Sequence, residues 1–408
     1  MEKIKTAIDL KNAMNKGPEM LKSIGDCKQI YLEWYVDNFG YDDEQEEQLT
    51  LNKINNLKQT LKGNYYSEFI LEEDYNIKIK NYEGDIKIPQ DKLIEMYSNA
   101  VDSPYGDVKN LETVVDKSVR NAREITDIEV DPNIISKIEE EWKKKLYPSK
   151  VKAVPYKVNL YTSKGHFNEH LDTPEKDLVG TALISLWDKN NKNNSSLKLS
   201  DIQKERNVRW NPDESSCIMF YSDCPHEVNS YYDDDDKNIR ATLAFKIFSI
   251  NQESNFDEYK INTVISSLKN FNLLNKGFIL EHDYSLETKS LKGCDAILVT
   301  ALNKMGYELS LIPIMYNFTL ESYHNEDDIH ECKVFPLRET DINYLLELSE
   351  QEEIIYNNVE FYNLDGKHYV WKDERQAYSE YTGNESCPEN INSIYVSRAI
   401  IITDLKEK

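Results

Sequence analysis

The stretch that decides the fold of this chain runs from Tyr156 to Ile250, and its centre reads Gly165-His-Phe-Asn-Glu-His170-Leu-Asp172-Thr-Pro174. A second segment follows, Phe220-Tyr-Ser-Asp-Cys-Pro-His226-Glu-Val228, and then Arg240-Ala-Thr-Leu-Ala-Phe-Lys-Ile247. His170 and Asp172 are two residues apart, so on a strand or at its end both side chains leave the same face. His226 comes 56 residues after His170, and Arg240 follows 14 residues after that.

Two imidazoles and one carboxylate are candidate ligands of a single metal ion. His170, Asp172 and His226 match the facial triad of non-haem Fe(II) oxygenases, in which three protein ligands fill one face and leave the opposite positions open. A lone His-x-Asp also arises by chance in a chain of 408 residues. The strands predicted around the motif favour the metal site over the chance match.

The residues around both candidate metal segments have the pattern of strands. Hydrophobic residues alternate before the first histidine, and three further β-type segments follow: Val154, Tyr156, Val158 and Leu160, then 181–187, 217–221 and 240–250. Strands on both sides of the triad predict a mainly β catalytic core within an α+β chain. The architecture that suits them is a double-stranded β-helix of the jelly-roll or cupin type.

The same stretch resembles the Fe(II)/2-oxoglutarate-dependent dioxygenases, in the branch similar to prolyl 4-hydroxylases. That family carries a Tyr before the motif, His-x-Asp-Thr, a strand beginning with Thr, Phe-Tyr-x-Asp-x-x-His-Glu-Val, and a basic residue on the next strand. The resemblance covers about residues 100–250. It implies that His170, Asp172 and His226 bind Fe(II), with O2 and 2-oxoglutarate as cosubstrates and ascorbate as a reductant.

The resemblance also implies a pocket for 2-oxoglutarate. Arg240 would hold the distal carboxylate, because a planar guanidinium makes two parallel charge-assisted hydrogen bonds. Thr242 lies on the same strand face as Arg240, Tyr161 matches the family's tyrosine, and Thr181 is a further candidate. Nucleic-acid demethylases of the wider superfamily typically place a second Arg six residues after the first. Lys246 stands at that position here, which weakens a nucleic-acid reading.

The composition of the chain limits the classes of partner that it is expected to bind. The formal net charge is −24, which argues against stable binding to duplex nucleic acid or to an anionic membrane. No apolar run approaches the ~18 residues of a membrane span, and the N-terminus lacks the apolar core of a signal peptide. The six cysteines have no paired metal spacing, which is typical of reduced thiols. We therefore expect a cytoplasmic or nuclear protein that is not secreted.

The sequence predicts three segments: an N-terminal helical or mixed extension over 1–99, an oxygenase domain over 100–250 and an α/β accessory domain over 259–408. In the second, Asp131-Pro132 predicts the start of a helix. Arg120 and Arg123 are expected in surface salt bridges, and the alternative is that they reach an acidic substrate or brace the site. In the third, 259–268 predicts a helix, and 297–302, 307–314 and 394–402 predict strands. The acidic run 233–236 predicts a solvated loop.

Three functions remain open from the sequence. The first is hydroxylation of an unactivated C–H bond on a protein side chain, with proline the leading substrate and succinate and CO2 as products. The second is the same oxygenase chemistry on a small molecule or a nucleic-acid base. The third is a non-catalytic interaction protein that has kept the fold. The intact set of His170, Asp172, His226 and Arg240 favours an enzyme over the third reading.

Overall fold

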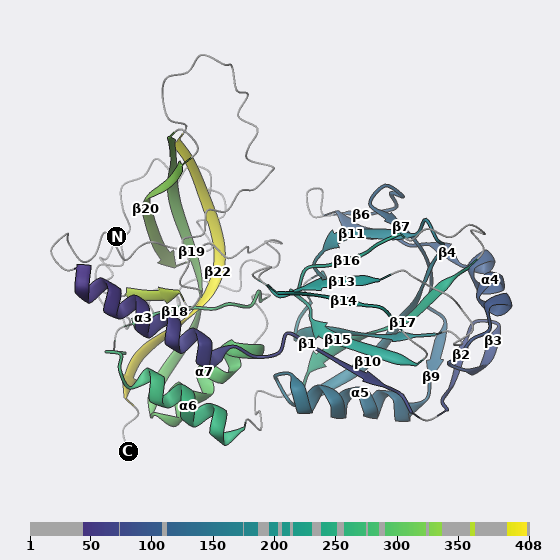
Figure 1. Cartoon of the computed structure of the whole chain (residues 1–408), viewed down its shortest axis with the longest axis horizontal. Helices are drawn as coiled ribbons and strands as arrows, with labels where there is room; N and C mark the ends of the chain where they lie inside the picture. The colour runs from purple at the N-terminus through teal and green to yellow at the C-terminus, as the bar shows by residue number, and fades with distance from the viewer. Residues whose placement is uncertain are drawn as a thin grey trace, which may run out of the picture. The chain divides into compact units, whose positions relative to one another are not determined.

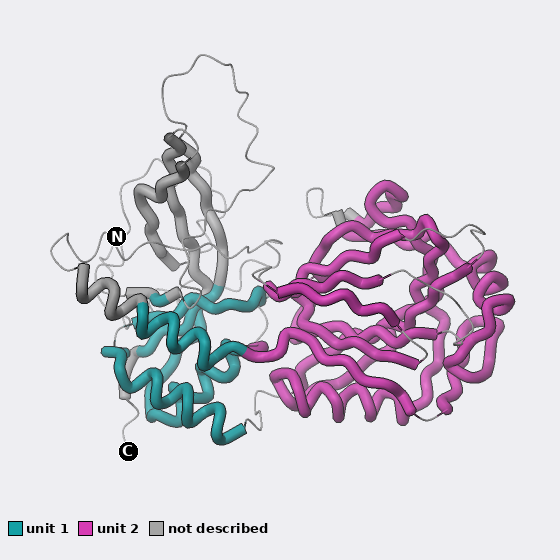
Figure 2. Tube along the Cα trace, viewed as in Figure 1, with its two compact units in different colours: residues 1–62, 256–287, 294–408 teal, residues 63–255, 288–293 magenta. Residues whose placement is uncertain are grey.

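The computed structural model describes residues 44–336, apart from short gaps, together with 360–363 and 390–405. The gaps are 73, 108–111, 174, 187–195, 203–205, 213–214, 231–237, 251–256, 275, 285–289 and 324–325, so the predicted acidic loop at 233–236 lies outside the described residues. The chain forms two compact units (Figure 2). One comprises Met1–Lys62, Phe256–Glu287 and Cys294–Lys408, and the other Gly63–Asn255 and Thr288–Gly293.

These units divide the chain differently from the three predicted segments. Residues 63–99, which the sequence assigns to an N-terminal extension, belong to the same unit as the predicted oxygenase domain. The reason is strand pairing, because β1 (Tyr66–Ile70) joins the sheet of the core through antiparallel bonds to β15 (Ser216–Tyr221). Pairing between residues so far apart leaves no local signal in the sequence.

The core of the unit that contains Gly63–Asn255 consists of eight strands, most of which are labelled in Figure 1. They are β10 (Val151–Tyr161), β11 (His166–His170), β12 (Leu178–Ser185), β13 (Leu197–Ser200), β14 (Asn207–Trp210), β15 (Ser216–Tyr221), β16 (His226–Val228) and β17 (Arg240–Ser249). One sheet contains the order β15-β12-β17-β10 and the other the order β14-β13-β16-β11. Because successive strands cross from one sheet to the other, apart from the β13–β14 hairpin, the topology is that of a jelly roll.

Further elements extend this core. The large sheet gains β1 at one edge and β8 (Arg123–Ile125) and β4 (Val101–Asp102) at the other, and the small sheet gains β7 (Arg120–Asn121). The strands β2 (Asn76–Ile79), β3 (Tyr82–Asp85) and β9 (Ile128–Val130) form a separate sheet, and β5 (Tyr105–Asp107) pairs with β6 (Glu112–Val114). Helix α4 (Gln90–Asn99) follows β3 and buries Leu93 and Met96.

Helix α5 (Pro132–Lys145) supports the large sheet and begins where the sequence predicts. Asp131 accepts a hydrogen bond from the Asn133 backbone N–H, which caps the helix, and Trp142 on its inner face is fully buried. The indole lies so close to β12 that a Cβ on Gly180 would come within 2.4 Å of it and within 2.3 Å of the Phe220 carbonyl oxygen. Glycine at 180 is therefore what lets the helix approach the sheet.

Strand β10 is buried on both of its faces over its second half. The alternating Val158 and Leu160 are buried as predicted, whereas Tyr156 is 44% exposed, because the register shifts between Pro155 and Lys157. The residues between the hydrophobic ones are polar, Lys157 and Asn159, and these are buried as well. The strand therefore carries buried hydrophobic side chains on one face and buried polar side chains on the other.

In the described part of the other unit, three helices accompany a five-stranded sheet. The helices are α3 (Glu44–Leu61), α6 (Glu258–Leu268) and α7 (Gly293–Lys304), and the sheet has the order β20 (Glu326–Pro336), β19 (Tyr307–Tyr323), β22 (Asn390–Leu405), β18 (Lys276–Ile279) and β21 (Glu360–Asn363). The predicted helix at 259–268 and strands at 307–314 and 394–402 are present. No helix among the described residues is long and apolar enough to cross a membrane.

The strand predicted over 297–302 is wrong, because these residues lie in α7. Most residues of this helix are buried, including Ile297, Leu298, Ala301 and Leu302. A short apolar run that is buried on several sides has no clear period, and periodicity alone does not distinguish such a helix from a buried strand.

Candidate metal centre

Strand pairing brings the two histidines together. His170 is the last residue of β11 and His226 is the first of β16, and the two are direct partners in the antiparallel register of the small sheet. Side chains of directly opposed residues leave the same face of a sheet. Asp172 follows β11 by two residues, and its backbone N–H donates to the Ser222 carbonyl oxygen at 3.0 Å. This bond holds Asp172 beside the turn that precedes β16.

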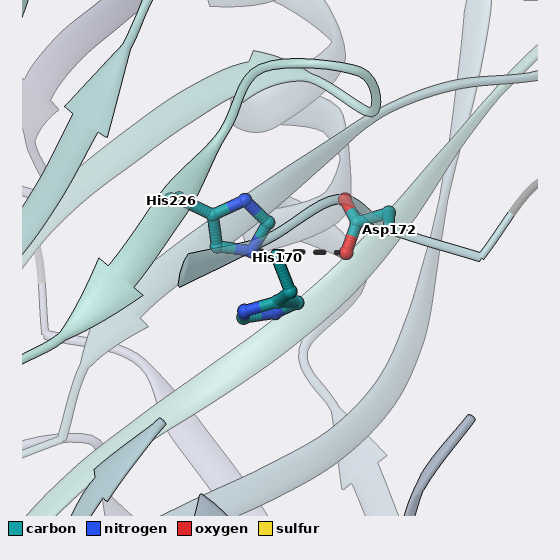
Figure 3. A group of neighbouring side chains, drawn as sticks. All are labelled: His170, Asp172 and His226. Atoms are coloured by element: carbon teal, nitrogen blue, oxygen red, sulfur yellow. Dashed lines mark ion pairs between the residues drawn. The ribbon is translucent and has the colours of Figure 1, made fainter. Parts of the chain in front are cut away.

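The three side chains converge on one point (Figure 3). One ligand atom from each of His170, Asp172 and His226 lies within 4.8 Å of the other two, and His226 Nε2 is 3.9 Å from Asp172 Oδ1. Bonds of about 2.0–2.2 Å from nitrogen and carboxylate ligands place two ligands of one ion at most about 4.4 Å apart. The 3.9 Å between His226 Nε2 and Asp172 Oδ1 lies within that maximum, whereas the 4.8 Å limit for the whole set slightly exceeds it, so the side chains would have to move closer together to hold one ion. The donor set is the 2-His-1-carboxylate set of non-haem Fe(II) sites.

Backbone carbonyls fix the tautomer of both imidazoles. His170 Nδ1 lies 2.8 Å from the Asn168 carbonyl oxygen, and His226 Nδ1 lies 2.9 Å from the Cys224 carbonyl oxygen. A carbonyl oxygen only accepts, so each Nδ1 carries the hydrogen and each Nε2 keeps its lone pair. Metal-binding histidines are held by hydrogen bonds of this kind.

The surroundings keep His170 neutral. Desolvation, followed by the neighbouring His226, holds the pKa of the His170 imidazole well below its ordinary value of 6.5. The ring stacks on Phe167 with centroids 3.5 Å apart, and the ring of Phe220 lies 4.8 Å from that of His226. A neutral imidazole is the form that binds a metal, so these apolar walls favour ligation.

Thr181 is bound to a triad residue. Its hydroxyl donates to Asp172 Oδ2 at 2.7 Å, in the range of a charge-assisted hydrogen bond. The sequence assigned Thr181 to the cosubstrate pocket, but the structure shows its hydroxyl on the candidate metal ligand. The contact leaves Oδ1 of Asp172 facing His226.

The other three predicted pocket residues lie together on the large sheet. Arg240 and Tyr161 are partners in the pairing of β17 with β10, and the guanidinium carbon is 5.3 Å from the centre of the Tyr161 ring. Thr242 stands two residues on from Arg240 and is therefore on the same face. Arg240 is 1% exposed and Thr242 is 2% exposed, so this is a buried polar cluster.

The register relates this cluster to the triad. Thr181 is opposite Lys246 in the pairing of β12 with β17, and Ser185 is opposite Thr242. All of these positions share one face of the large sheet, so the Thr181 contact to Asp172 and the Arg240 cluster lie on the same side. Four residues separate Thr181 from Ser185, which is about 13 Å along a strand.

Sequence reasoning missed a buried polar group on the same face, between these two points. In the register of the large sheet, Lys157 is opposite Ala244, and Ala244 is opposite Leu183. The ammonium of Lys157 is 2.7 Å from Glu124 Oε2. Desolvation, then the nearby Arg120, lowers the pKa of Lys157, although Glu124 opposes both effects. The polar alternation of Lys157, Asn159 and Tyr161 is the signal that could have revealed this face.

Arg120 is buried, so the expected surface position is wrong, although its guanidinium does pair with Glu124 at 3.9 Å. It is 6% exposed, donates to the Pro104 carbonyl oxygen at 2.7 Å and to Asn159 Oδ1 at 3.0 Å, and lies 4.6 Å over the Phe167 ring. Because Phe167 stacks on His170, Arg120 braces the site, which was the alternative reading. Arg123 is half-buried and ion-pairs with Asp102 at 3.4 Å.

Comparisons with known proteins gave only distant similarities. No protein-family model matches the chain, and no curated protein matches it in sequence. Among solved structures, the chain is similar to a prolyl hydroxylase from Trichoplax adhaerens in complex with a hypoxia inducible factor peptide (15% identity, TM-score 0.31, 51% of this chain and 94% of that chain). It is also similar to a prolyl-4-hydroxylase from Pseudomonas putida (12% identity, TM-score 0.27, 48% and 100%).

A third similarity is to SnoN, a non-haem α-ketoglutarate-dependent epimerase of nogalamycin biosynthesis (10% identity, TM-score 0.27, 50% and 83%). Two of these structures are thus prolyl hydroxylases and the third is an α-ketoglutarate-dependent epimerase. They cover about half of the chain, and their scores are too low to transfer a residue or a substrate. The description of the site therefore rests on its own geometry and on the sequence motif.

Proposed function

We propose that this chain is an Fe(II)- and 2-oxoglutarate-dependent dioxygenase that hydroxylates an unactivated C–H bond on a protein side chain. The observation that carries the proposal is the locked geometry of the triad. Both imidazoles donate Nδ1–H to backbone carbonyls, which frees both Nε2 atoms, and Asp172 Oδ1 faces His226 Nε2 at 3.9 Å. This orientation leaves both Nε2 atoms available to a metal ion beside Asp172, which is the arrangement that metal-binding histidines require.

The remaining site residues support the same chemistry. Bound Fe(II) would supply the activation of dioxygen, with 2-oxoglutarate as the source of two electrons and the origin of succinate and CO2. Arg240 would hold the distal carboxylate of 2-oxoglutarate, because it is a buried cation on the face that Thr181 shares. Thr242 would donate its hydroxyl to the same carboxylate, and the Tyr161 ring would fix the guanidinium plane.

The protein-substrate part of the proposal, with proline as the side chain, rests on the sequence motif. His170-Leu-Asp172-Thr and Phe220-Tyr-Ser-Asp-Cys-Pro-His226-Glu-Val resemble the motifs of the prolyl 4-hydroxylase branch. Lys246, at the position of the second arginine of nucleic-acid demethylases, is occupied by an ion pair with Glu175. A lysine lacks the planar, two-pronged guanidinium of arginine, which favours a protein substrate over a nucleic-acid base.

The first test is anaerobic titration of Fe(II) and then 2-oxoglutarate into the full chain, followed by the visible charge-transfer band of the chelate. We expect the band in the wild type and in His166→Ala, and its loss in His226→Ala. His166 is the matched control, because it lies on the same strand but its ring nitrogens face the Lys164 and Ser118 carbonyl oxygens. A folded wild type without the band, or a band that survives His226→Ala, would contradict the proposal.

A second test addresses the substrate. Proline-containing peptides incubated with the enzyme, Fe(II), 2-oxoglutarate and O2 should gain one oxygen atom by mass spectrometry, in step with succinate formation. Succinate formed at the same rate with and without every peptide, in a protein that shows the chelate band, would leave the oxygenase assignment standing and reject the peptide substrate.

A further inference from the structure

A short segment far along the chain belongs to the jelly-roll unit. Residues Thr288–Gly293 group with Gly63–Asn255, although the chain on both sides of this segment belongs to the other unit. Of these, Ser290, Leu291, Lys292 and Gly293 are described, and the Gly293 N–H donates to the Tyr147 carbonyl oxygen at 3.3 Å. Nothing in the proposed chemistry uses this segment directly.

Lys292 makes a buried ion pair in the core. Its ammonium is 2.9 Å from Asp223 Oδ2, with the two side chains only 2% and 4% exposed, and it lies 3.4 Å from Ser222 Oγ. Both of its side chains are less exposed than those of the Arg120–Glu124 and Lys157–Glu124 pairs. Removing one partner of a buried pair leaves the other charge desolvated and uncompensated, so the two charges are held together.

Lys292 binds side chains of the turn 222–224, and backbone carbonyls of this turn orient two of the three candidate ligands. The Ser222 carbonyl oxygen accepts the Asp172 N–H at 3.0 Å, and the Cys224 carbonyl oxygen accepts Nδ1–H of His226 at 2.9 Å. Asp223 stands between these two acceptors. The turn is also tied to its surroundings, because the Ser222 N–H donates to the Val179 carbonyl oxygen at 3.2 Å.

We infer that Lys292 is a positioning residue for the metal centre, which acts by fixing the 222–224 turn through Asp223. This inference rests on the proposed function, since it concerns the same site. It assigns a role in the site to a residue 120 positions after Asp172, outside the segment that resembles the oxygenase family. The ammonium sets the place of two carbonyl oxygens, and these set the place of one carboxylate and the tautomer of one imidazole.

The test is equilibrium binding of Co(II) to the metal-free full chain, with the visible d–d spectrum of the bound ion as a second readout. We expect Lys292→Met to weaken Co(II) binding by about 10- to 100-fold, the usual effect of losing a partner that orients a metal ligand. We also expect a changed d–d spectrum, because the ligand geometry relaxes. The matched control is Ile138→Ala, which removes a fully buried side chain on α5 and destabilises the core without touching the turn.

A second variant covers the case in which Lys292→Met does not fold. The double variant Asp223→Asn/Lys292→Gln removes both charges together, so no lone charge remains buried, and it should fold yet bind Co(II) weakly. A folded variant with the wild-type affinity and spectrum would overturn the inference, as would weakening of equal size in Ile138→Ala or failure of both Lys292 variants to fold. Absence of Co(II) binding by the wild type would instead reject the metal centre itself, and the inference with it.

Discussion

Replacing Thr181 with valine removes one hydroxyl and nearly preserves the shape of the side chain. In the structure that hydroxyl donates to Asp172 Oδ2 at 2.7 Å and restrains the carboxylate whose other oxygen faces His226. A hydrogen bond to a charged group contributes about 1.5–3 kcal/mol. At about 1.4 kcal/mol per factor of ten, its full loss corresponds to about 10- to 150-fold in affinity.

We expect Thr181→Val to lose metal affinity by a factor within that range and below its upper end. Part of the hydrogen-bond energy is already present in the metal-free protein, so part of its loss lowers the stability of the fold and does not reach the metal affinity. Removal of groups that orient metal ligands typically weakens metal binding by about 10- to 100-fold. We therefore expect a Co(II) or anaerobic Fe(II) dissociation constant raised by about tenfold or somewhat more in Thr181→Val.

Two controls make this test specific. Thr181→Ser keeps the hydroxyl and should bind metal within a few-fold of the wild type. Thr242→Val removes the same group from the same face of the sheet, about 13 Å further along, and should leave metal affinity unchanged. If Thr181→Val binds metal as tightly as the wild type, the Thr181 hydroxyl does not position Asp172 for metal binding.

Three further predictions use the same protein. Arg240→Gln should raise the half-saturating concentration of 2-oxoglutarate by at least about tenfold while metal binding is retained, since a buried charged contact contributes about 1.5–3 kcal/mol; an unchanged value would assign the distal carboxylate to another residue. Gly180→Ala should destabilise the fold by about 1–3 kcal/mol or more, because its methyl group would overlap Trp142 and the backbone; thermal melting at the wild-type temperature would contradict the packing. Folding lowers the pKa of His170, so below about pH 6.5 the unfolded metal-free chain binds a proton on this imidazole that the folded chain does not. The free energy of unfolding should therefore fall as the pH drops below about 6.5, by at most about 1.4 kcal/mol per pH unit. Chemical denaturation of metal-free wild type and His170→Asn at several pH values should show the shallower dependence in the variant.

Much of the jelly-roll core could be predicted because its signals are local. The spacing of His170 and Asp172 places both on one face of an extended segment, and the capping residue Asp131 marks the start of α5. These features depend on backbone periodicity and on bonds between near neighbours. The strand predicted at 297–302 was wrong because this local signal is missing there. A buried helix of apolar residues has no single hydrophobic stripe from which its period can be read.

The sequence by itself determined the composition of the candidate site: two histidines, one aspartate and one arginine, set among strands. Only the tertiary structure decided how they meet. The pairing of His170 with His226, the burial of Arg120 beside Phe167, the hydroxyl of Thr181 on Asp172 and the ammonium of Lys292 on Asp223 all join residues on different elements. Such contacts depend on strand register and on which charges lose their water, and these are set by the packing of the whole unit, because local periodicity does not encode them.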